Sequence, residues 1–519
     1  MYAPELHCTY VPELPKLAWL ATLNRETLRL EVLHGSAVEI ADDWIVEGVW
    51  DGEFAPGEFH RSDHFFGSGI RIDGDDVHFV PSSALVDRLL YAEQDGQLIV
   101  SNSLPLLLAG VGARLDPAHH YREESRAILQ GIRDYNREFR VQHPQLRAIT
   151  QLYHDRLVAT RGGSSFRSPP EPPHIESFDH YRQLLRGVLR RIHANYTAPE
   201  RTHRVSAFTT VSSGYDSPAV STLVREIGVR ECFTSCRSRS LIPAIISRRA
   251  AVDDGTPIAR ALGMRVHALD LRRSQVSEDE LYFLAASSVA AELVFHSMAK
   301  HIEAENEVAV VFSGFHGDKV WDAATHGRYL SDQIKRGDTS GLNLSEIRLK
   351  SGFIHVAVPF LFARNVREIV AISNAPEMEP WRMHNKYDRP IPRRIAEEVG
   401  VPRQAFGIRK KAVTYYYNYP VHRELRQDFF RYTHDRLGRT RAFVYLYDRA
   451  NRSALPVRLA MHRAKKRLGL RSRAPHRITF WRNQDLFHDM HVWAVETLRD
   501  RLARVLARVE PAPATQLLR

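Results

Sequence analysis

The sequence predicts an α/β protein in which a β-rich amino-terminal region precedes a domain built on a parallel sheet with crossover helices. Three observations support this prediction. Short β-like segments separated by turns occupy residues 17–108. A strand, a turn of small residues and a helix follow one another at residues 205–225, and a second buried strand at 308–313 opens into a similar turn. Beyond about residue 423 the chain is helix-like and basic, which predicts a helical extension.

The bulk composition is typical of a globular protein with more than one domain. The chain has 519 residues, of which 44% are hydrophobic and 26% charged. No apolar run approaches the roughly 20 residues that cross a bilayer, and the amino terminus lacks the order of a secretory signal. Three cysteines cannot build a disulfide framework in so long a chain. We therefore expect a cytoplasmic protein. The net charge of +11 suits nucleic acid, acidic glycans, membrane headgroups or nucleotide phosphates, and does not choose among them.

Alternating and turn-forming residues predict the amino-terminal strands. Residues 28–32 alternate in hydrophobicity, and residues 70–72 and 77–80 flank a turn-forming Asp-Gly-Asp-Asp segment, which predicts a hairpin. A strand at 97–103 runs into an apolar helix at 104–108. Residues 161–176 are rich in Gly, Ser and Pro and predict a linker after a first domain at 1–160.

A second domain is expected from residue 177 to residue 422. It opens on a helix whose apolar residues recur at intervals of three and four, namely Leu184, Leu185, Val188, Leu189 and Ile192. Strand and helix patterns then repeat at 205–225, 231–235, 253–263 and 266–271. This repetition favours a parallel sheet, and ligands of such sheets bind at the carboxyl ends of the strands.

The turn after the strand at 205–211 carries the chemistry. Its residues are Ser212, Ser213, Gly214, Tyr215, Asp216 and Ser217. Backbone N–H groups, hydroxyls and the positive end of the following helix suit a phosphate chain. A carboxylate among phosphates is repulsive unless a divalent cation lies between them, so Asp216 predicts a magnesium ion (Mg²⁺). The alternative is an ordinary strand with a Ser/Gly turn and a helix cap.

A second turn, after the strand at 308–313, repeats the pattern. Ser313 and Gly314 are followed by Asp318 and Lys319. Asp318 is the second candidate metal ligand, and phosphate oxygens and water would complete the shell. A buried strand followed by a polar turn is the alternative interpretation here.

These two turns resemble the motifs of one family. The segment 212–217 resembles the S-G-G-x-D-S pyrophosphate loop (PP-loop) of the asparagine synthetase-like ATP pyrophosphatases, with Ser213 where glycine is usual. The segment 313–319 resembles the family's S-G-E-G-A-D-E segment, with Asp318 at the metal-binding aspartate. Phe315 stands where a glutamate is usual, and Lys319 replaces the glutamate after the aspartate.

The resemblance implies ATP and Mg²⁺ as cofactors and an adenine-nucleotide α-hydrolase-like fold. It implies nucleotide contacts from residues 212–217, from Ser313 and Gly314, and from Thr234 and Ser235 at the end of the second strand. A later segment, 387–411, is similar to the family's P-x-x-(I/F)-x-x-R-x-K region, which makes Lys410 or Lys411 a candidate stabiliser of the leaving pyrophosphate. A solvated basic turn is the alternative, and Lys319 is a further catalytic candidate.

The segment 97–108 resembles the end of the glutaminase-type amino-terminal (Ntn) domain of asparagine synthetases. Active glutaminases of that family carry a cysteine directly after the initiator methionine, and here Tyr2 takes that place, while Cys8 is not at a chain end. We expect a degenerate domain that does not hydrolyse glutamine and has a structural or docking role toward a protein partner.

Residues 423–519 form the basic extension. A basic run at 462–473 and the apolar residues Leu498, Leu502, Val505 and Leu506 predict amphipathic helices. Such helices lie on acidic membranes or nucleic acid, or they pack on their own protein or face solvent.

The combined prediction is an ATP-dependent, AMP-forming carbon–nitrogen ligase that adenylates a carboxylate and transfers the acyl group to an amine. Relatives without the glutaminase cysteine include β-lactam synthetases and lasso-peptide cyclases, so the resemblance implies a small-molecule or peptide carboxylate, with modification of a specialised metabolite, peptide or glycan. A homodimer is left open, and nucleic acid is not an expected partner. One alternative is a nucleotide-binding pseudoenzyme that acts as a partner or regulator. The other is an RNA-modifying PP-loop enzyme, against which the glutaminase-like first domain argues.

Overall fold

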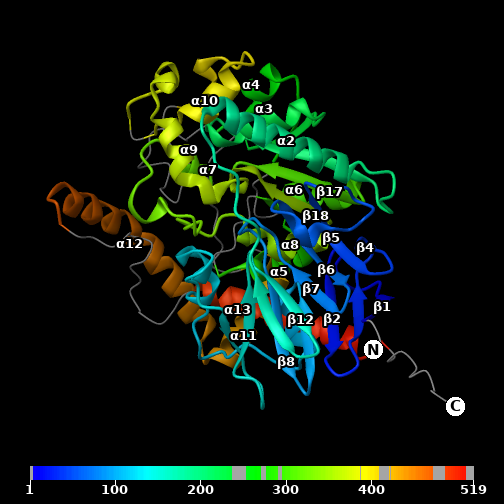
Figure 1. Cartoon of the computed structure of the whole chain (residues 1–519). Helices are drawn as coiled ribbons and strands as arrows, with labels where there is room; N and C mark the ends of the chain where they lie inside the picture. Colours follow the sequence, from blue (N-terminus) through cyan, green and yellow to red (C-terminus); the bar gives the residue numbers. More distant parts are fainter. Residues whose placement is uncertain are drawn as a thin grey trace.

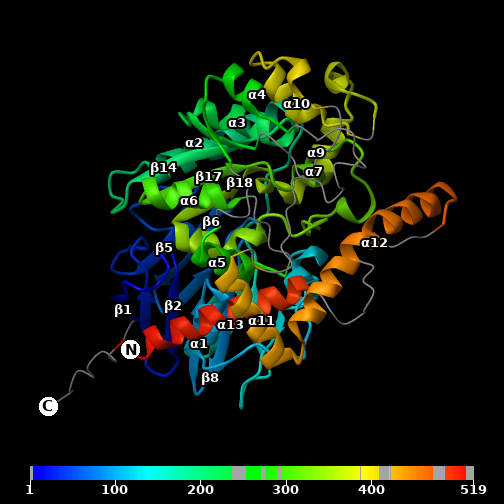
Figure 2. The same ribbon diagram turned by 180° about the vertical axis from the view of Figure 1, so that it is seen from behind.

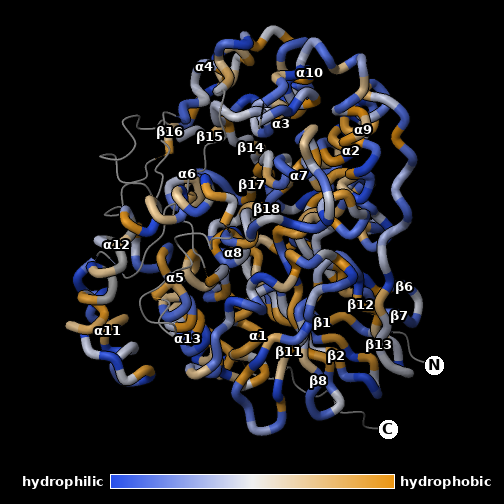
Figure 3. Tube along the Cα trace, turned by 90° about the vertical axis from the view of Figure 1, so that its left-hand side faces the viewer, coloured by the Kyte–Doolittle hydropathy of each residue, from blue (hydrophilic) through white to orange (hydrophobic). Residues whose placement is uncertain are grey.

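The computed structural model describes residues 4–235, 253–269, 276–289, 295–385, 387–407, 420, 422–470 and 486–509. Three sheets and the helices around them make up this part of the chain (Figure 1). Hydrophobic residues gather where the sheets and helices pack together (Figure 3). No helix in the described ranges is both long and apolar enough to cross a membrane.

The amino-terminal region is β-rich, as predicted, and contains two sheets. One sheet has the strand order β1-β3-β2-β9-β8-β11-β10 and the other β13-β12-β7-β6-β5-β4. The strands are β1 (Glu5–Tyr10), β2 (Trp19–Asn24), β3 (Arg29–His34), β4 (Glu39–Ile40), β5 (Trp44–Trp50), β6 (Phe65–Asp73), β7 (Asp76–Val80), β8 (Leu89–Gln94), β9 (Gln97–Ser101), β10 (Glu138–Arg140), β11 (Ala148–Leu152), β12 (Arg156–Thr160) and β13 (Gly163–Arg167). Trp19 and Leu98 of the first sheet share a buried cluster with Ile45, Phe79 and Leu157 of the second, so the two sheets pack face to face. The predicted hairpin is confirmed, since Asp73 pairs with Asp76 across the turn that joins β6 and β7.

The second region is built on a five-stranded parallel sheet, which confirms the predicted sheet type. Its strands are β14 (Val205–Val211), β15 (Glu231–Thr234), β16 (Arg265–Ala268), β17 (Val308–Ser313) and β18 (Phe353–Ala357), in the spatial order β16-β15-β14-β17-β18. Chain order therefore reverses direction between β14 and β17. In open α/β sheets this reversal point, at the carboxyl ends of the strands, is where ligands bind.

Helices cover both faces of the parallel sheet. They are α2 (Phe178–Tyr196), α3 (Asp216–Glu226), α4 (Thr256–Ala261), α5 (Glu278–Ser287), α6 (His296–Glu305), α7 (Gly317–Val320), α8 (Ser345–Ser351), α9 (Val366–Ser373) and α10 (Pro390–Glu397). Helices α2 and α3 lie on one face and α6 and α8 on the other (Figures 1 and 2). The face of α2 predicted to be apolar is the buried one, with Leu185, Val188 and Ile192 inside. Short 3₁₀ turns are η1 (Phe59–Arg61), η2 (Glu124–Gln130), η5 (Gly327–Tyr329), η6 (Leu342–Leu344), η7 (Val358–Phe360), η8 (Ala363–Asn365), η9 (Pro376–Trp381) and η10 (Arg403–Ala405).

A buried ionic cluster joins the β-rich region to the parallel-sheet region. Arg348 on α8 donates to Glu47 on β5 at 2.7 and 3.0 Å and to Asp87 at 2.5 Å. Beside it, Glu346 accepts from the Ser103 hydroxyl at 2.7 Å and from the Leu104 amide at 2.8 Å. Ser103 is the N-cap of helix α1 (Leu104–Gly110) and accepts from the Leu106 amide, while Glu346 satisfies the first amide of the helix, so the junction is specified by charge and capping together.

The segment predicted to be a linker is partly structured. Residues 163–167 form β13, which pairs with β12. The Pro-rich part that follows is held against the start of α9. Arg364 and Asn365 donate to the carbonyls of Pro170 and Pro173 at 2.7 and 3.0 Å, and Ile175 donates to Glu368 at 2.8 Å.

The carboxyl-terminal extension is helical and contains α11 (Arg423–Leu437), α12 (Arg441–Arg467) and α13 (Leu486–Leu506). Helix α13 buries Leu498 and Leu502, and its Glu496 accepts from the Leu115 amide at 2.7 Å. The final helix therefore packs on its own protein, which was one of the alternatives open from the sequence. Helix α12 instead extends away from the body of the molecule (Figures 1 and 2).

Candidate functional site

The first turn closes on itself through hydroxyl groups. The Ser212 amide donates to the Ser217 hydroxyl at 2.9 Å, and the two hydroxyls lie 2.9 Å apart. The Gly214 amide donates to the Ser212 hydroxyl at 3.2 Å. Ser212 and Ser217 thus fix the shape of a loop that leads from β14 directly into α3.

An aspartate that the sequence did not single out holds the middle of this loop. Both the amide and the hydroxyl of Ser213 donate to one oxygen of Asp253, at 3.1 and 2.7 Å. Asp253 is buried, whereas its neighbour Asp254 turns to the Thr256 amide at 2.9 Å, next to α4. The sequence analysis assigns residues 253–263 only to the repeating pattern of strands and helices. The pair of adjacent aspartates is the one signal there that could have pointed to a contact with the first turn.

Helix α3 begins at the loop without a side-chain cap. Tyr215 precedes it and makes no capping bond, and Asp216 is its first residue. The Tyr215 ring is buried and stacks on Tyr387 at 4.8 Å, with Phe406 at 5.3 Å. The tyrosine side chain therefore belongs to the packing beneath the loop, while the positive end of α3 remains at the sheet edge.

The two turns meet at Asp216. A Cβ added to Gly314 would lie 2.7 Å from the backbone nitrogen of Ser217, and one added to Gly317 would lie 2.6 Å from the carboxyl carbon of Asp216. Such distances leave room only for glycine. Asp318, the residue after Gly317, is thereby brought to the same sheet edge as Asp216.

Each of the two aspartates has a basic partner. Arg389 donates to Asp216 through a nitrogen of its guanidinium, and Lys319 donates to Asp318 at 2.7 Å. Burial lowers the pKa of Arg389, but the nearby Asp216, Tyr387 and Asp318 outweigh burial, and the net direction of its pKa is upward. Arg389 is 2% exposed, so it is a buried cation at the meeting point of the two turns. Arg389 lies in the segment 387–411 noted from the sequence, but the sequence pattern predicts no role for this residue.

The second turn is anchored on β18 and lined by rings. The Ser313 hydroxyl shares a hydrogen bond of 2.6 Å with His355, whose pKa falls to about 3, chiefly because of burial and further because of Arg348 and Arg336. Phe315 packs on His355 at 5.2 Å, and His316, in the left-handed backbone region, stacks on Phe360 at 4.6 Å. Phe315, at the position where a glutamate was expected by resemblance, is thus part of an aromatic wall.

The remaining predicted residues divide into two groups. Thr234 is buried and its hydroxyl accepts from the Gly255 amide at 3.0 Å, which fixes the chain before α4; Ser235 follows it at the end of β15. Lys410 and Lys411 lie outside the described residues. The described part of their segment does reach the site, because the Gly407 amide donates to the Ser213 carbonyl at 2.7 Å.

No group of three or more His, Cys, Asp or Glu side chains suited to a metal ion occurs among the residues that the structure describes. Mg²⁺ at nucleotide sites uses one or two carboxylates together with phosphate oxygens and water. A site of this kind would need Asp216 and Asp318 as its carboxylate ligands.

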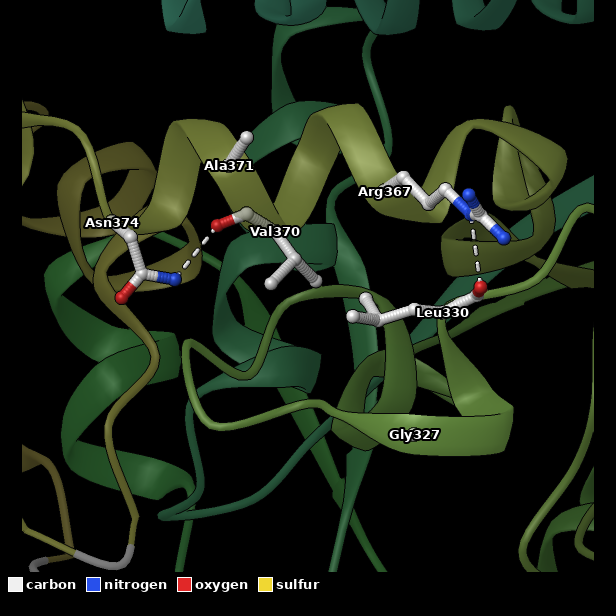
Figure 4. A pocket seen from close by; sticks show the side chains of 6 residues that line it. All are labelled: Gly327, Leu330, Arg367, Val370, Ala371 and Asn374. Atoms are coloured by element: carbon white, nitrogen blue, oxygen red, sulfur yellow. Dashed lines mark hydrogen bonds between the residues drawn. The ribbon is translucent and has the colours of Figure 1, made fainter.

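Two neighbouring cavities lie along α9. One, of about 570 Å³, is lined by Gly327, Leu330, Arg367, Val370, Ala371 and Asn374 (Figure 4). The other, of about 430 Å³, shares Arg367 and includes Glu171 and Glu368. Neither is lined by a residue of the two turns, so we do not assign either cavity to the chemistry of the turns.

Comparison with known proteins adds no assignment: no family model matches the chain, and no curated protein is similar enough in sequence to count as a match.

Proposed function

We propose that this protein is an ATP-dependent, AMP-forming amide ligase of the PP-loop type. It adenylates a substrate carboxylate, releases pyrophosphate and passes the acyl group to an amine. The observation that carries the proposal is the contact of the two turns. Gly314 and Gly317 lie against the start of α3 and Asp216, at the reversal point of a parallel sheet, and Asp318 directly follows Gly317.

The residues at this point fit a magnesium triphosphate. Negatively charged phosphate oxygens would be attracted by the start of α3, which has no side-chain cap, and by the cations of Arg389 and Lys319. Asp216 and Asp318 would hold Mg²⁺, which when bound neutralises and orients the phosphates.

The side chains of the protein contribute mainly by positioning and charge. Arg389 and Lys319 pair with Asp216 and Asp318 and add positive charge where negative charge grows on the leaving pyrophosphate. Aromatic rings pack around the second turn, Phe315 on His355 and His316 on Phe360, and such packing helps to exclude water from a reactive acyl-adenylate.

The amine source follows from the second turn. Phe315 stands where the segments it resembles carry a glutamate, so this position lacks a carboxylate that could hold a small ammonium ion. This feature favours an amine carried by the substrate itself, as in ring closure within a specialised metabolite or a peptide.

The proposal is tested by measuring Mg²⁺-dependent binding of ATP and the products formed from α-labelled ATP with a panel of amine-bearing carboxylates. AMP and pyrophosphate are the expected products. D216N and D318N are each expected to weaken binding of magnesium ATP by at least about tenfold, since each removes one charge contact. D179N on the exposed part of α2 is the matched control and should bind as the parent does. Release of ADP and phosphate, or ATP binding that neither variant changes, would contradict the proposal.

A nucleotide-binding protein without turnover is the second candidate. Two observations favour it: both aspartates already have basic partners, and the Ser213 amide is bonded to Asp253. Magnesium ATP would then bind with the same sensitivity to D216N, but no AMP would form with any carboxylate in the panel. The product analysis separates the two candidates, because binding is common to both.

A further inference from the structure

Helix α12 has an exposed apolar stripe. Leu446, Val457 and Met461 are 66%, 62% and 55% exposed, and Leu468, just beyond the helix end, is 73% exposed. Burial of such side chains is worth more than 1 kcal/mol each, so their exposure along one helix is unusual for a surface with no partner.

The stripe has helical periodicity. Its members are residues 446, 450, 454, 457, 461, 464 and 468, at intervals of three and four, with alanine at 450, 454 and 464. At 3.6 residues per turn these positions fall on one face of the helix. From residue 446 to residue 468, at a rise of about 1.5 Å per residue, the stripe extends for about 33 Å.

The same helix carries most of the net charge of the chain. Residues 441–467 contain eight Lys and Arg residues against one Asp, a net charge of +7, whereas the whole chain has +11. By helical spacing, Arg449 and Arg467 fall on one border of the stripe, and Arg458 and Lys465 on the other. An apolar stripe bordered by basic residues on both sides is typical of helices that lie in the interface of an anionic bilayer.

We propose that α12 binds the surface of a bilayer that contains anionic lipid, with its apolar stripe toward the acyl chains and its basic borders at the headgroups. The charge distribution favours this occupant. A second copy of the helix would bring two strongly positive segments together. Nucleic acid would engage the basic residues but leave the apolar stripe in water. An anionic bilayer provides acyl chains for the apolar stripe and negative headgroups for the basic borders. Helix α12 extends away from the body of the molecule, so it can reach a membrane surface (Figure 2).

The test is flotation of the full chain with vesicles of phosphatidylcholine, with and without an equal part of phosphatidylglycerol. Binding is expected only to the anionic vesicles, and added salt should weaken it. A charge variant, R463Q/K465Q/R467Q, should lose on the order of 100-fold in partitioning, because each basic side chain near an anionic surface contributes about fivefold. An apolar variant, L446Q/V457Q/M461Q, should lose at least about tenfold.

Matched controls carry the same types of change elsewhere. Arg190 on α2, Lys300 on α6 and Val399 are exposed in the structure, and R190Q/K300Q and V399Q should bind as the parent does. Thermal unfolding of every variant establishes that it is folded. Equal binding to neutral and anionic vesicles, or no binding to either, would overturn the proposal. So would a dimer in sedimentation that the apolar variant dissociates, since the stripe would then be occupied by a second copy.

Discussion

The two turns of the candidate site share a sequence pattern but are built differently. Each follows a buried strand with serine and glycine and contains an aspartate. The first turn is closed by the hydroxyls of Ser212 and Ser217 and leads into a helix of 11 residues. The second leads into a helix of only 4 residues and is held from outside, by His355 and by aromatic packing.

This difference separates two roles. The first turn leads into a helix of 11 residues, and a helix start of that length suits a phosphate group. This turn is also held from distant segments, by Asp253 and Arg389. The second turn leads into a much shorter helix and contains the carboxylate of Asp318. Its position depends on contacts with β18, through His355. We therefore expect changes at the first turn to act mainly through charge, and changes at the second to act through packing.

The largest expected effect comes from the basic partners of the two aspartates. Arg389 is almost fully buried, so R389M leaves Asp216 without its cation and should lower the free energy of unfolding by about 3 kcal/mol or more. The Lys319 side chain is 21% exposed, and K319M should lower the free energy of unfolding by about 1 kcal/mol or less, because water can solvate Asp318 once the ammonium group is gone. Urea unfolding of the two variants measures the contrast, and equal losses would mean that the turns are not distinct in this respect.

A smaller effect is expected from separating the turns. In G314A the new Cβ meets backbone atoms of Ser217 and Asp216, which cannot rotate away, so about 1–3 kcal/mol of stability should be lost, together with affinity for magnesium ATP. The control is G187A on α2, where the nearest atom to the added Cβ is 3.5 Å away in a flexible arginine side chain. That change should be neutral or stabilising. Unaltered ATP binding in G314A would show that contact between the turns is not needed.

Lowering the pH should destabilise the protein in part through His355, which anchors the second turn. The folded-state pKa of His355 is about 3, below its ordinary 6.5, so as pH falls the unfolded chain takes up this proton first. Stability from His355 is full above pH 6.5 and is lost as pH falls toward 3, by about 2 kcal/mol at pH 5. Other buried histidines contribute as well, so the measurement is the difference in pH dependence between the parent and H355Q. Parallel curves would show that His355 is not the acid-sensitive anchor of Ser313.

The sequence predicts the elements that depend on residues close together in the chain. The strand, turn and helix at 205–226 and the strand at 308–313 follow from hydrophobic runs and small turn residues, and the parallel sheet follows from their repetition. Asp253 and Arg389 were not assigned because they contact the first turn from 40 and 173 residues away, and no periodic pattern records such a contact. Tyr215 is predicted among the nucleotide contacts as part of the loop, and the sequence does not show that its ring packs on Tyr387 and Phe406, because these partners come from a distant segment.

The smallest expected effect concerns the residue by which the first turn departs from the PP-loop pattern. S213G restores the usual glycine but removes the hydroxyl that donates to Asp253 at 2.7 Å. The hydrogen bond from the backbone amide of residue 213 to Asp253, at 3.1 Å, stays in place. Because a buried carboxylate then loses one of its donors, the variant should be less stable by about 1 kcal/mol. D253A should cost at least as much, because it removes the acceptor of both the Ser213 hydroxyl and the Ser213 amide. The double variant S213G/D253A should cost less than the sum of the two, since both changes remove the same hydrogen bond between the hydroxyl and the carboxylate. Additive losses would mean that the Ser213 hydroxyl and Asp253 do not stabilise each other.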